Sequence, residues 1–576
     1  MNNYGNISII LSQICEQSTL NYENADKIIY FSHLLRMSKP IIYQILPRLF
    51  GNRDKPCTHN GTIEENGCGK FNDFTPAVLK KIKDMGFTHI WYTGVIRHAT
   101  TTDYSKFKIP NQHPAVVKGK AGSAYAICDY YDVDPDLAVD PNNRMKEYEA
   151  LLERTHQAGL KVIMDFVPNH VARQYKSICK PAGVKDLGED DDSSVHFSPS
   201  NNFYYNPGQS LVLPNEIKDI KDRNGNVYTE TPAKSTGNDH FDQYPTMNDW
   251  YETVKLNYGI DYLNNRTYHF DPIPNTWIKM TDILLYWSSK NIDGFRCDMA
   301  EMVPSQFWSY ATDRVKAAHP NLVFIGEVYN PAQYREYICA GFNYLYDKVG
   351  MYDCVRDCIC HRRPTNQITC QWQSTSDIIP HMLYFLENHD EQRIGSDFFA
   401  GMPAHAIPGF VTCALMNSNP YMVYAGGEYG EHGMDDEGFS GRDGRTTIFD
   451  YWSPRNLRLG YYDYDSLDGQ EHWLYDTHRN VLNIAHNEKA INEGAFFDLM
   501  YVNPQLGERQ FAYLRKVESD QSTFILVVSN YNDCDVSLDI TIPDHAFNSL
   551  KISPGNYKVT DLLTNNSFDA SINPLL

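Results

Sequence analysis

The sequence has fewer basic than acidic residues, no long apolar run and no repeated or low-complexity segment. It contains 51 Lys and Arg against 72 Asp and Glu, for a formal net charge of -21. Nucleic acids and anionic membranes select basic surfaces, so this balance argues against both as partners. No apolar stretch approaches the roughly 20 residues of a membrane span. The N-terminus lacks a basic segment ahead of its short apolar run at 7–11, so we expect no secretory signal.

Cysteine patterns typical of disulfide frameworks and zinc sites are also missing. The 13 Cys are odd in number and scattered along the chain, which favours a reducing compartment and a cytoplasmic location. The tightest group is Cys354, Cys358 and Cys360 followed by His361, and it lacks the Cys-x-x-Cys spacing of a zinc site. We interpret these cysteines as buried thiols. We expect no organic cofactor, and no pattern specifies an oligomeric state.

Length and aromatic content indicate the kind of protein. At 576 residues the chain is too long for one simple core, so two or three domains are expected. Aromatic residues make up 13% of the chain, including 40 Tyr and 8 Trp. Flat rings beside many Asp and Asn residues suit sugar binding, although aromatic residues mostly pack cores.

From about residue 40 onward, apolar runs that suit buried strands alternate with amphipathic runs that suit helices. Helix-like segments at 75–86, 143–159 and 276–291 follow the usual capping and stop rules. Eight strand–helix units in this order predict an α/β fold, a closed (β/α)8 TIM barrel. The eight predicted strands begin at Ile41, His89, Val162, Gly294, Val323, Tyr344, Leu383 and Tyr421.

The rest of the pattern predicts three additions to the barrel. A helical pattern at 24–38 predicts an N-terminal helical extension over 1–38. The barrel is expected over 39–170 and 261–485, with an inserted subdomain at 171–260 after its third strand, because a structureless loop of that size is uncommon. Alternating runs separated by turn residues predict a C-terminal antiparallel β-sandwich domain over 486–576.

The stretch DGFRCDMAEM, Asp293 to Met302, places Arg296 and Asp298 two residues apart in a strand-like run. Residues i and i+2 of a strand point to the same side, so the guanidinium and the carboxylate should lie together. Two interpretations are open at this point. The pair is a structural ion pair, or Asp298 is a nucleophile whose pKa is lowered by the fixed positive charge.

Other carboxylates are expected at the same end of the barrel. Asp165, Glu327 and Asp390 lie at the ends of the third, fifth and seventh predicted strands, where TIM barrels place their chemistry. Each alone could be a helix cap or a loop ion pair. Together they suit glycosidic bond cleavage, which needs one ionised and one protonated carboxyl group. Asp298 beside Arg296 suits the ionised role, and Glu327, with apolar flanks and no adjacent cation, suits the acid with a raised pKa.

Four segments resemble, in order and on the expected strands, the hallmark segments of the α-amylase family, glycoside hydrolase family 13. They are DFVPNH (Asp165–His170), GFRCD (Gly294–Asp298), IGEV (Ile325–Val328) and ENHD (Glu387–Asp390). The stretch AYAICDYYDVDPDLA, from Ala124, resembles the segment after the family's second strand. The resemblance covers the chain from about residue 40 to the end, including the inserted subdomain and the C-terminal β domain.

This resemblance implies an α-amylase-type hydrolase that cleaves α-1,4-glucosidic bonds in starch, glycogen or maltodextrins, with retention, through a covalent glycosyl-enzyme. It implies that Asp298 is the nucleophile and Glu327 the general acid/base, with Asp390 as a third carboxylate that grips the sugar. Arg296 would keep Asp298 ionised. The other implied substrate-binding residues are Tyr125, which would stack on the sugar, and Asp165, His170 and His389.

A structural calcium ion is also implied. Asn169 matches a position that binds calcium in many members, at the junction of barrel and insertion. Oxygen ligands suit calcium, and the insertion offers the acidic run 189–192. Such a run is as readily a solvated loop.

Two positions depart from the pattern of many α-amylases, which carry a Lys-His pair three and four residues after the nucleophile. Here Glu301 and Met302 occupy those positions. An acidic residue there resembles the neopullulanase and cyclomaltodextrinase side of the family, and a structural role for Glu301 is an equal alternative. An α-glucosidase or a glucanotransferase of the same family also fits. A non-catalytic sugar-binding relative is the alternative from another class, and the presence of all three carboxylates argues against it.

Overall fold

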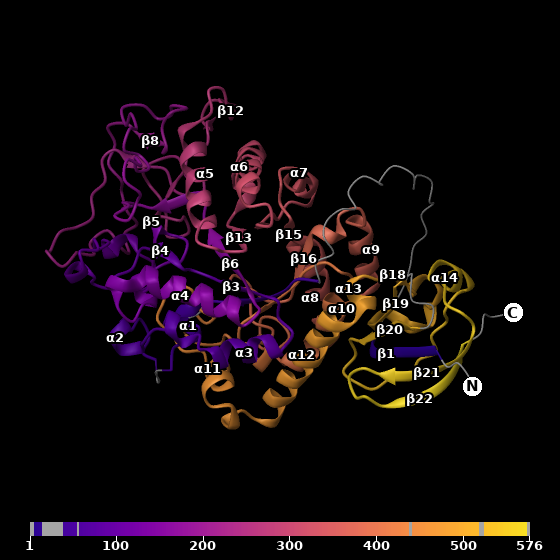
Figure 1. Cartoon of the computed structure of the whole chain (residues 1–576). Coiled ribbons are helices and arrows are strands. Elements are labelled where there is room, and N and C mark those ends of the chain that lie inside the picture. The colour runs from indigo at the N-terminus through magenta and orange to yellow at the C-terminus, as the bar shows by residue number, and fades with distance from the viewer. Residues whose placement is uncertain (1–4, 14–38, 54–56, 437–440, 518–522, 573–576) are drawn as a thin grey trace.

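The structure is a computed structural model that describes residues 5–13, 39–53, 57–436, 441–517 and 523–572. Eight parallel strands form a closed barrel, in which each strand pairs with the next along the chain and the last pairs with the first (Figure 1). The predicted TIM barrel and its eight strands are confirmed. These strands are β2 (Ile41–Ile45), β3 (His89–Tyr92), β6 (Lys161–Phe166), β13 (Gly294–Cys297), β14 (Val323–Gly326), β15 (Tyr344–Tyr346), β16 (Met382–Phe385) and β17 (Tyr421–Tyr424).

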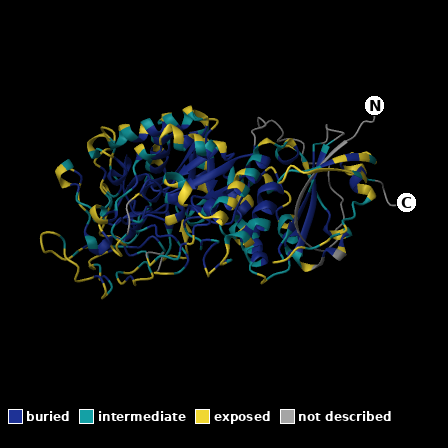
Figure 2. Cartoon of the chain, turned by 90° about the horizontal axis from the view of Figure 1, so that it is seen from below, coloured by how far each residue is buried: buried dark blue, intermediate teal, exposed yellow. Residues whose placement is uncertain are grey.

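Helices cover the outside of the barrel, and Figure 2 shows exposed outer faces around buried strands. The helix α3 illustrates the local cause: Thr75 caps it by accepting from the Val78 backbone N–H, and Pro76 occupies its first turn. Among the described residues, no helix is long and apolar enough to cross a bilayer. The main helices after the strands are α3 (Pro76–Asp84), α4 (Arg144–Gln157), α5 (Asn275–Ser288), α6 (Ser305–Ala318), α7 (Tyr334–Cys339), α8 (Asp353–Ile359), α9 (Asn366–Ser374), α10 (Ile407–Leu415) and α12 (Gly469–Asn487).

The interior of the barrel is a packed core. Ile42, Ile163, Ile325 and Leu383 come from four different strands, are at most 2% exposed and belong to one buried cluster. Because apolar side chains fill the barrel, a binding site has to lie at the ends of the strands, in the loops that follow them.

Strand register sets which side chains meet at those ends. Arg296 on β13 pairs with Asp165 on β6 and with Ile325 on β14. Asp298 and Glu327 each follow two residues further along these neighbouring strands, on the same side as Arg296 and Ile325 respectively. The register therefore brings one guanidinium beside carboxylates from three strands.

The insertion is tied together at its base. Its first strand, β7 (His170–Ala172), pairs with β10 (Thr253–Lys255), so the two ends of a segment of about eighty residues meet beside the barrel. Within this segment β8 (Tyr205–Asn206) pairs with β9 (Ala233–Lys234). After it, β11 (Ile260–Asp261) pairs with β12 (Thr267–Tyr268). A further pair that the sequence analysis did not predict, β4 (Ile96–His98) with β5 (Ile127–Val133), follows β3.

The C-terminal domain is one six-stranded sheet in the described part of the chain, rather than the two sheets of a sandwich. Its strand order is β18 (Ala495–Asp498), β19 (Gln510–Lys516), β20 (Thr523–Asn530), β1 (Gly5–Gln13), β21 (Gly555–Asp561) and β22 (Ser567–Ile572). The pairs β18–β19, β19–β20 and β21–β22 are antiparallel, as predicted, whereas β1 runs parallel to both of its neighbours.

The strand β1 corrects the predicted helical extension over 1–38. Gly5–Gln13 is a strand in the C-terminal sheet, far along the chain from its partners (Figure 1). Its sequence is rich in Ile, whose branched Cβ favours strands once a sheet is present to receive it. The helix predicted at 24–38 lies outside the described residues. Of the three cysteines interpreted as buried thiols, Cys354 and Cys358 are buried on α8, whereas Cys360 directly after it is only partly buried.

Candidate active site

A pocket lies at the C-terminal ends of the barrel strands. Asp298 follows β13, Glu327 follows β14, and the loops after β4, β6 and β16 supply Tyr125, His170 and Asp390. Six side chains that matter for chemistry line it: Tyr125, His170, Asp298, Glu327, Tyr329 and Asp390. The structure thus brings together five residues that the sequence analysis singled out and adds Tyr329.

Arg296 lies beneath the pocket and contacts three carboxylates. Its Nη1 is 2.9 Å from Asp298 Oδ1 and 3.4 Å from Asp165 Oδ1, and its Nη2 is 2.8 Å from Glu327 Oε2. The prediction that Arg296 and Asp298 lie together is confirmed. The assumption that Glu327 has no adjacent cation is wrong, because strand register places it beside the same guanidinium.

Burial raises the pKa values of two acids in this cluster, Asp298 and Asp165. Burial raises the pKa of Asp298 well above its usual value, Arg296 opposes that rise, and the charges of Glu327, Asp165 and Asp390 add to it. Burial likewise raises the pKa of Asp165 to about 6. The expectation that Arg296 would lower the pKa of Asp298 is correct for the effect of Arg296 and wrong for the net direction, because one cation does not offset burial beside other carboxylates.

His389 connects the barrel floor to the pocket. Its Nδ1 is 2.7 Å from Gln44 Nε2, and its Nε2 is 3.1 Å from Asp390 Oδ2 and in hydrogen-bond contact with the Tyr125 hydroxyl. Burial, together with the charge of Arg296, lowers the pKa of His389 well below its usual value, so the imidazole is neutral. A neutral ring held on both nitrogens has a fixed orientation.

Asp165 and His170 complete the predicted set. The Trp91 indole N–H donates to Asp165 Oδ2 over 3.0 Å, which holds this buried carboxylate beside Arg296 and below the pocket lining. The His170 ring lies in the pocket and packs against the ring of Trp250, with centroids 5.2 Å apart. Burial lowers the pKa of His170 to about 3.

Tyr329, which no sequence motif indicated, places its hydroxyl 2.6 Å from Glu327 Oε1. The other oxygen of Glu327 accepts from the Met299 backbone N–H over 2.7 Å. Tyr329 stands two residues after Glu327 in the irregular segment beyond β14, so nearness in sequence was the available signal. A hydroxyl can donate to the ionised carboxylate and accept from the protonated acid, so it fits both states of Glu327.

Glu301 binds backbone N–H groups of a neighbouring loop and does not line the pocket. Its Oε2 accepts from the backbone N–H groups of Tyr329 and Asn330, each over 2.9 Å. These contacts fix the loop after β14 directly beyond Glu327. They favour the structural alternative for this residue over a contact with substrate.

The surroundings of Asn169 do not fit a calcium ion. Its side-chain oxygen accepts from Lys255 Nζ over 2.7 Å, and that ammonium also lies 2.6 Å from Asp239 Oδ1. The Asn169 amide nitrogen donates to the Gly237 carbonyl. A buried ammonium therefore stands where a cation would have to bind the Asn169 oxygen, and like charges exclude one another.

The acidic run 189–192 also has protein partners. Glu189 pairs with Lys180 at 3.0 Å and Asp190 with Lys185 at 2.7 Å, while Asp191 accepts from two backbone N–H groups and a tyrosine hydroxyl. These contacts favour the alternative in which the run is a loop held by its neighbours.

A second acidic group, Asp129 and Asp132 with Cys179, has metal-like spacing but is similarly engaged. Both oxygens of Asp132 accept from Arg144, and Asp129 accepts from backbone N–H groups that include that of Ile178. Arg144 therefore already neutralises Asp132, and backbone N–H groups already satisfy Asp129.

A barrel with a cluster of buried carboxylates around one guanidinium at its strand ends has the architecture of a glycoside hydrolase. The sequence matches the family described as "Alpha amylase, catalytic domain" over residues 44–493, most of the chain. The chain belongs to the α-amylase family and is a glycoside hydrolase of that family.

Its similarity to individual relatives is low. It is 23% identical over 434 residues to Alpha-amylase 3 of Dictyoglomus thermophilum, an alignment that covers 71% of this chain and 74% of the relative. It is 21% identical over 518 residues to Neopullulanase 2 of Thermoactinomyces vulgaris, covering 84% and 72%. A maltogenic α-amylase structure from Thermotoga neapolitana superposes with a TM-score of 0.59 at 19% identity, covering 94% of this chain and 96% of that one. The structural likeness shows a common fold.

Proposed function

We propose that this hydrolase cleaves α-1,4-glucosidic bonds in starch, glycogen or maltodextrins with retention of anomeric configuration. The observation that carries the proposal is the pair of carboxylates on one guanidinium, Asp298 and Glu327 on Arg296. A retaining glycosidase uses two closely placed carboxyl groups, one as nucleophile and one as acid/base, and Arg296 holds these two together.

In the first step, Glu327 gives its proton to the glycosidic oxygen as the bond to the leaving sugar breaks. Asp298 attacks the anomeric carbon through Oδ2, which is buried and has no hydrogen-bond partner among the described residues. In the second step, Glu327 takes a proton from water, the oxygen of that water bonds to the anomeric carbon, and Asp298 leaves. Two inversions give net retention.

The other pocket residues bind the sugar. Tyr125 presents an aromatic ring, and His170 and Asp390 present polar atoms, to the unit whose anomeric carbon is attacked. His389 orients Tyr125 and Asp390 by its contacts with both. Asp165 lies deeper and acts on the pocket through Arg296.

The preferred substrate, the choice between hydrolysis and transfer, and the cellular location stay predictions. A relative named Neopullulanase 2 covers most of the chain, which supports a neopullulanase-like hydrolase as the second candidate. An α-glucosidase or glucanotransferase activity stays an alternative within the family. A cytoplasmic location also stays a prediction, and a relative over half of the chain is named Intracellular maltogenic amylase, from Bacillus subtilis.

A time course on maltoheptaose and soluble starch, with products resolved by length and by anomeric form, tests the proposal. We expect short α-anomeric maltodextrins from the wild type. Asp298→Asn should fold normally and lose at least about a thousandfold in kcat, because the nucleophile is gone. Asp313→Asn, at an exposed position on α6, serves as the matched control and should keep full activity.

Other products would redirect the assignment. Products longer than maltoheptaose would indicate a transferase, and glucose alone from the start would indicate an α-glucosidase. β-Anomeric first products, or near-normal turnover by Asp298→Asn, would overturn the retaining mechanism proposed for Asp298.

A further inference from the structure

One side of the pocket is closed by residues that the catalytic scheme does not use. Lys118, Trp250, Glu252 and Phe449, here called the end wall, line the same pocket as the catalytic carboxylates. Lys118 Nζ lies 3.2 Å from Glu252 Oε1, and the two side chains are 23% and 4% exposed. The wall joins the loop after β4, the insertion and the loop after β17 across the mouth of the barrel.

Glu252 has an unused acceptor in this wall. Its Oε2 is buried and has no hydrogen-bond partner among the described residues, while its Oε1 contacts Lys118. Burial raises the pKa of Glu252, and the charge of Lys118 opposes that rise. A buried carboxylate oxygen without a donor is costly, so a ligand that supplies a hydroxyl donor would bind there with a gain in free energy.

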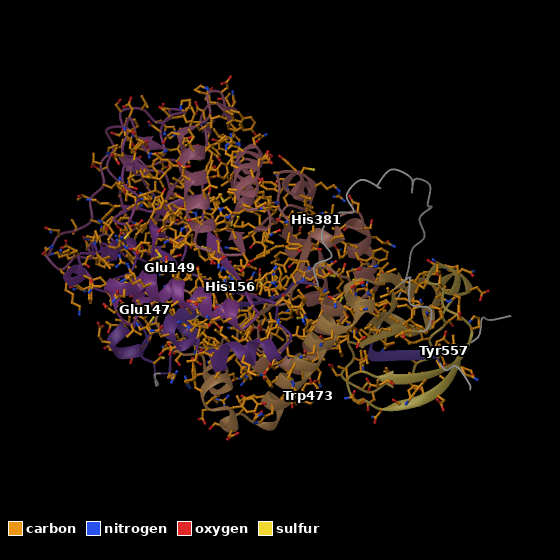
Figure 3. The ribbon with its side chains drawn as sticks, in the orientation of Figure 1. Glu147, Glu149, His156, His381, Trp473 and Tyr557 are labelled. Carbon is orange, nitrogen blue, oxygen red and sulfur yellow. The ribbon has the colours of Figure 1, made fainter. Side chains whose placement is uncertain are left out.

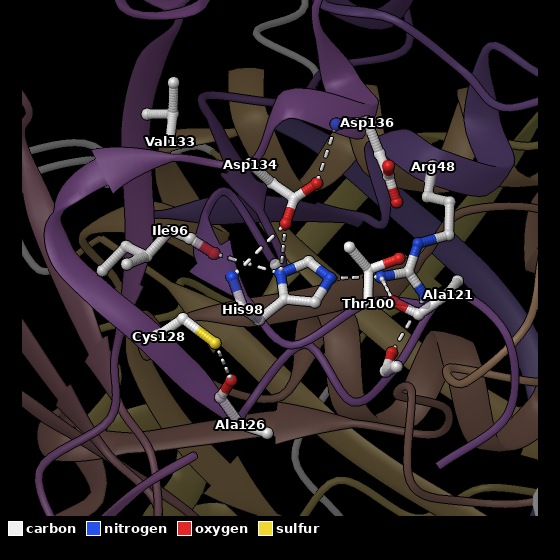
Figure 4. Close-up of polar contacts among 12 residues, drawn as sticks. Arg48, Ile96, His98, Thr100, Ala121, Ala126, Cys128, Val133, Asp134 and Asp136 are labelled. Carbon is white, nitrogen blue, oxygen red and sulfur yellow. Dashed lines mark hydrogen bonds and ion pairs between the residues drawn. The ribbon is translucent and has the colours of Figure 1, made fainter. Parts of the chain in front are cut away.

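The end wall is fixed in place before any ligand binds. The backbone N–H groups of Ala121 and Gly122, in the Lys118 loop, both donate to the Phe449 carbonyl over 3.0 Å. Arg48 donates to the carbonyls of Ala121 and Gly122 in the same loop and also contacts the His98 ring (Figure 4). A rigid donor–acceptor pair loses little entropy on binding.

The wall lies beside His170 and comes from other loops than the one that carries the proton donor. The Trp250 ring packs on His170, and the charge of Lys118 contributes to the low pKa of that histidine. Glu327 and Tyr329 come instead from β14 and mark where the leaving group departs. The wall therefore faces the sugar chain on the non-reducing side of the cleaved bond.

We propose that Glu252 and Lys118 bind hydroxyl groups of the glucosyl unit that precedes the one attacked, so that the enzyme favours donors with at least two α-linked glucosyl units on that side. This inference rests on the proposed function. The carboxylate accepts from one hydroxyl, the ammonium donates to another, and the rings of Trp250 and Phe449 offer apolar surface to the sugar face.

Two chromogenic substrates with the same leaving group, 4-nitrophenyl α-maltoside and 4-nitrophenyl α-glucoside, test the proposal. The release of nitrophenol is measured on each. We expect the wild type to have the higher kcat/KM on the maltoside. In Glu252→Gln and in Lys118→Met, the ratio of kcat/KM for maltoside over glucoside should fall about tenfold or more, as expected for loss of a charge-assisted hydrogen bond. Lys118 is partly exposed, so its variant tests the inference even where Glu252→Gln folds poorly.

The matched control is Lys290→Met, which removes a Lys–Glu pair of 2.6 Å with exposed Glu149 on α4 (Figure 3) and should leave the ratio unchanged. An unchanged ratio in both wall variants, or an equal fall on both substrates, would overturn the inference while leaving the hydrolase assignment intact. A wild type that cleaves neither of these substrates nor maltoheptaose would overturn the proposed function, and the inference with it.

Discussion

Arg296 contacts three buried carboxylates, and this crowding determines how the pocket titrates. Two of them, Asp298 and Glu327, are the proposed nucleophile and acid/base, and Asp390 adds a further negative charge that raises the pKa of Asp298. Like charges held together in a buried site lower stability, so the cluster trades stability for chemistry.

Replacement of Asp390 by a neutral residue should raise the stability of the folded protein. Burial, followed by the charge of Glu327, raises the pKa of Asp390 to about 7. An unfolded Asp ionises near pH 3.9, so between about pH 4 and pH 7 the folded protein binds more protons and its unfolding free energy falls as pH rises. Asp390→Asn should therefore abolish activity yet unfold about 1–3 °C above the wild type at pH 8, with a smaller gain at pH 4.5.

Calorimetry at the two pH values makes the measurement, with Asp313→Asn as the control. The expected gain is modest because the Asp390 side chain is 31% exposed and solvent screens it. A gain of equal size at both pH values would show that titration of Asp390 does not cause it.

Contacts between side chains of one strand were predictable from the sequence, whereas contacts between side chains of two strands were less so. The spacing of Arg296 and Asp298 predicted their contact from a single strand. The contact between Arg296 and Glu327 depends on the register of β13 against β14, which no local pattern specifies. Lys118 and Glu252 lie in irregular segments whose approach depends on the whole fold, so no spacing rule could have paired them.

At the scale of elements, the loop after β14 depends on Glu301. Glu301→Ala would leave the backbone N–H groups of Tyr329 and Asn330 unpaired and lower the unfolding free energy by about 1–3 kcal/mol. Because the loosened loop would displace Glu327, Glu301→Ala should also lower kcat by about tenfold. Glu301→Gln keeps an acceptor oxygen and should retain most of both quantities. Equal loss of kcat in the two variants, with normal stability, would instead indicate a charge contact with substrate.

The pairing of β7 with β10 depends on Lys255, whose ammonium joins Asn169 to Asp239. We expect the unfolding temperature of the wild type to be the same in EDTA and in millimolar calcium. Lys255→Met should lower the unfolding free energy by about 1–3 kcal/mol, less than for a fully buried ion pair because Asp239 is 31% exposed. Lys218→Met, an exposed change in the same subdomain, is the control. A calcium-dependent rise of several degrees in the wild type would contradict this account.

The barrel strands were predictable because they are buried on both faces and therefore read as continuous apolar runs. The short strands of the insertion, such as β8 and β9, carry no such pattern, since each spans two residues. Their pairing depends on contacts within the subdomain rather than on local preference.

At the scale of the whole molecule, Arg515 joins the C-terminal sheet to the barrel. This buried side chain on β19 donates to the carbonyl of Met416, which follows barrel helix α10. It also donates to the carbonyls of Ala490, Ile491 and Gly494, in the segment that connects α12 to β18. Burial lowers the pKa of Arg515 to about 10, so it is charged at neutral pH.

Arg515→Met would leave these carbonyls without their donor, and we expect a loss of about 2–4 kcal/mol in unfolding free energy with early proteolysis between the barrel and the sheet. Arg515→Lys, with fewer donors in a different geometry, should fall between that variant and the wild type. Arg314→Met, an exposed change on α6, is the control for thermal unfolding and limited proteolysis. Normal stability of Arg515→Met would show that the domains are held together by other contacts.

The architecture at this scale was predicted in its order of domains but not in its long-range pairing. The strand β1 completes a sheet whose other members lie near the opposite end of the chain. Local pattern cannot specify such a partner, because its free energy comes from contacts that form only after the sheet is assembled.

Identification of the residue that carries the covalent intermediate tests the central claim most directly. The enzyme would be incubated with a fluorinated maltosyl fluoride that forms the glycosyl-enzyme faster than water removes it, then digested and analysed by mass spectrometry. The account predicts one added glycosyl group on Asp298, absent from Asp298→Asn. A glycosyl group on Glu327 or another side chain, or no adduct together with inverted products, would contradict it.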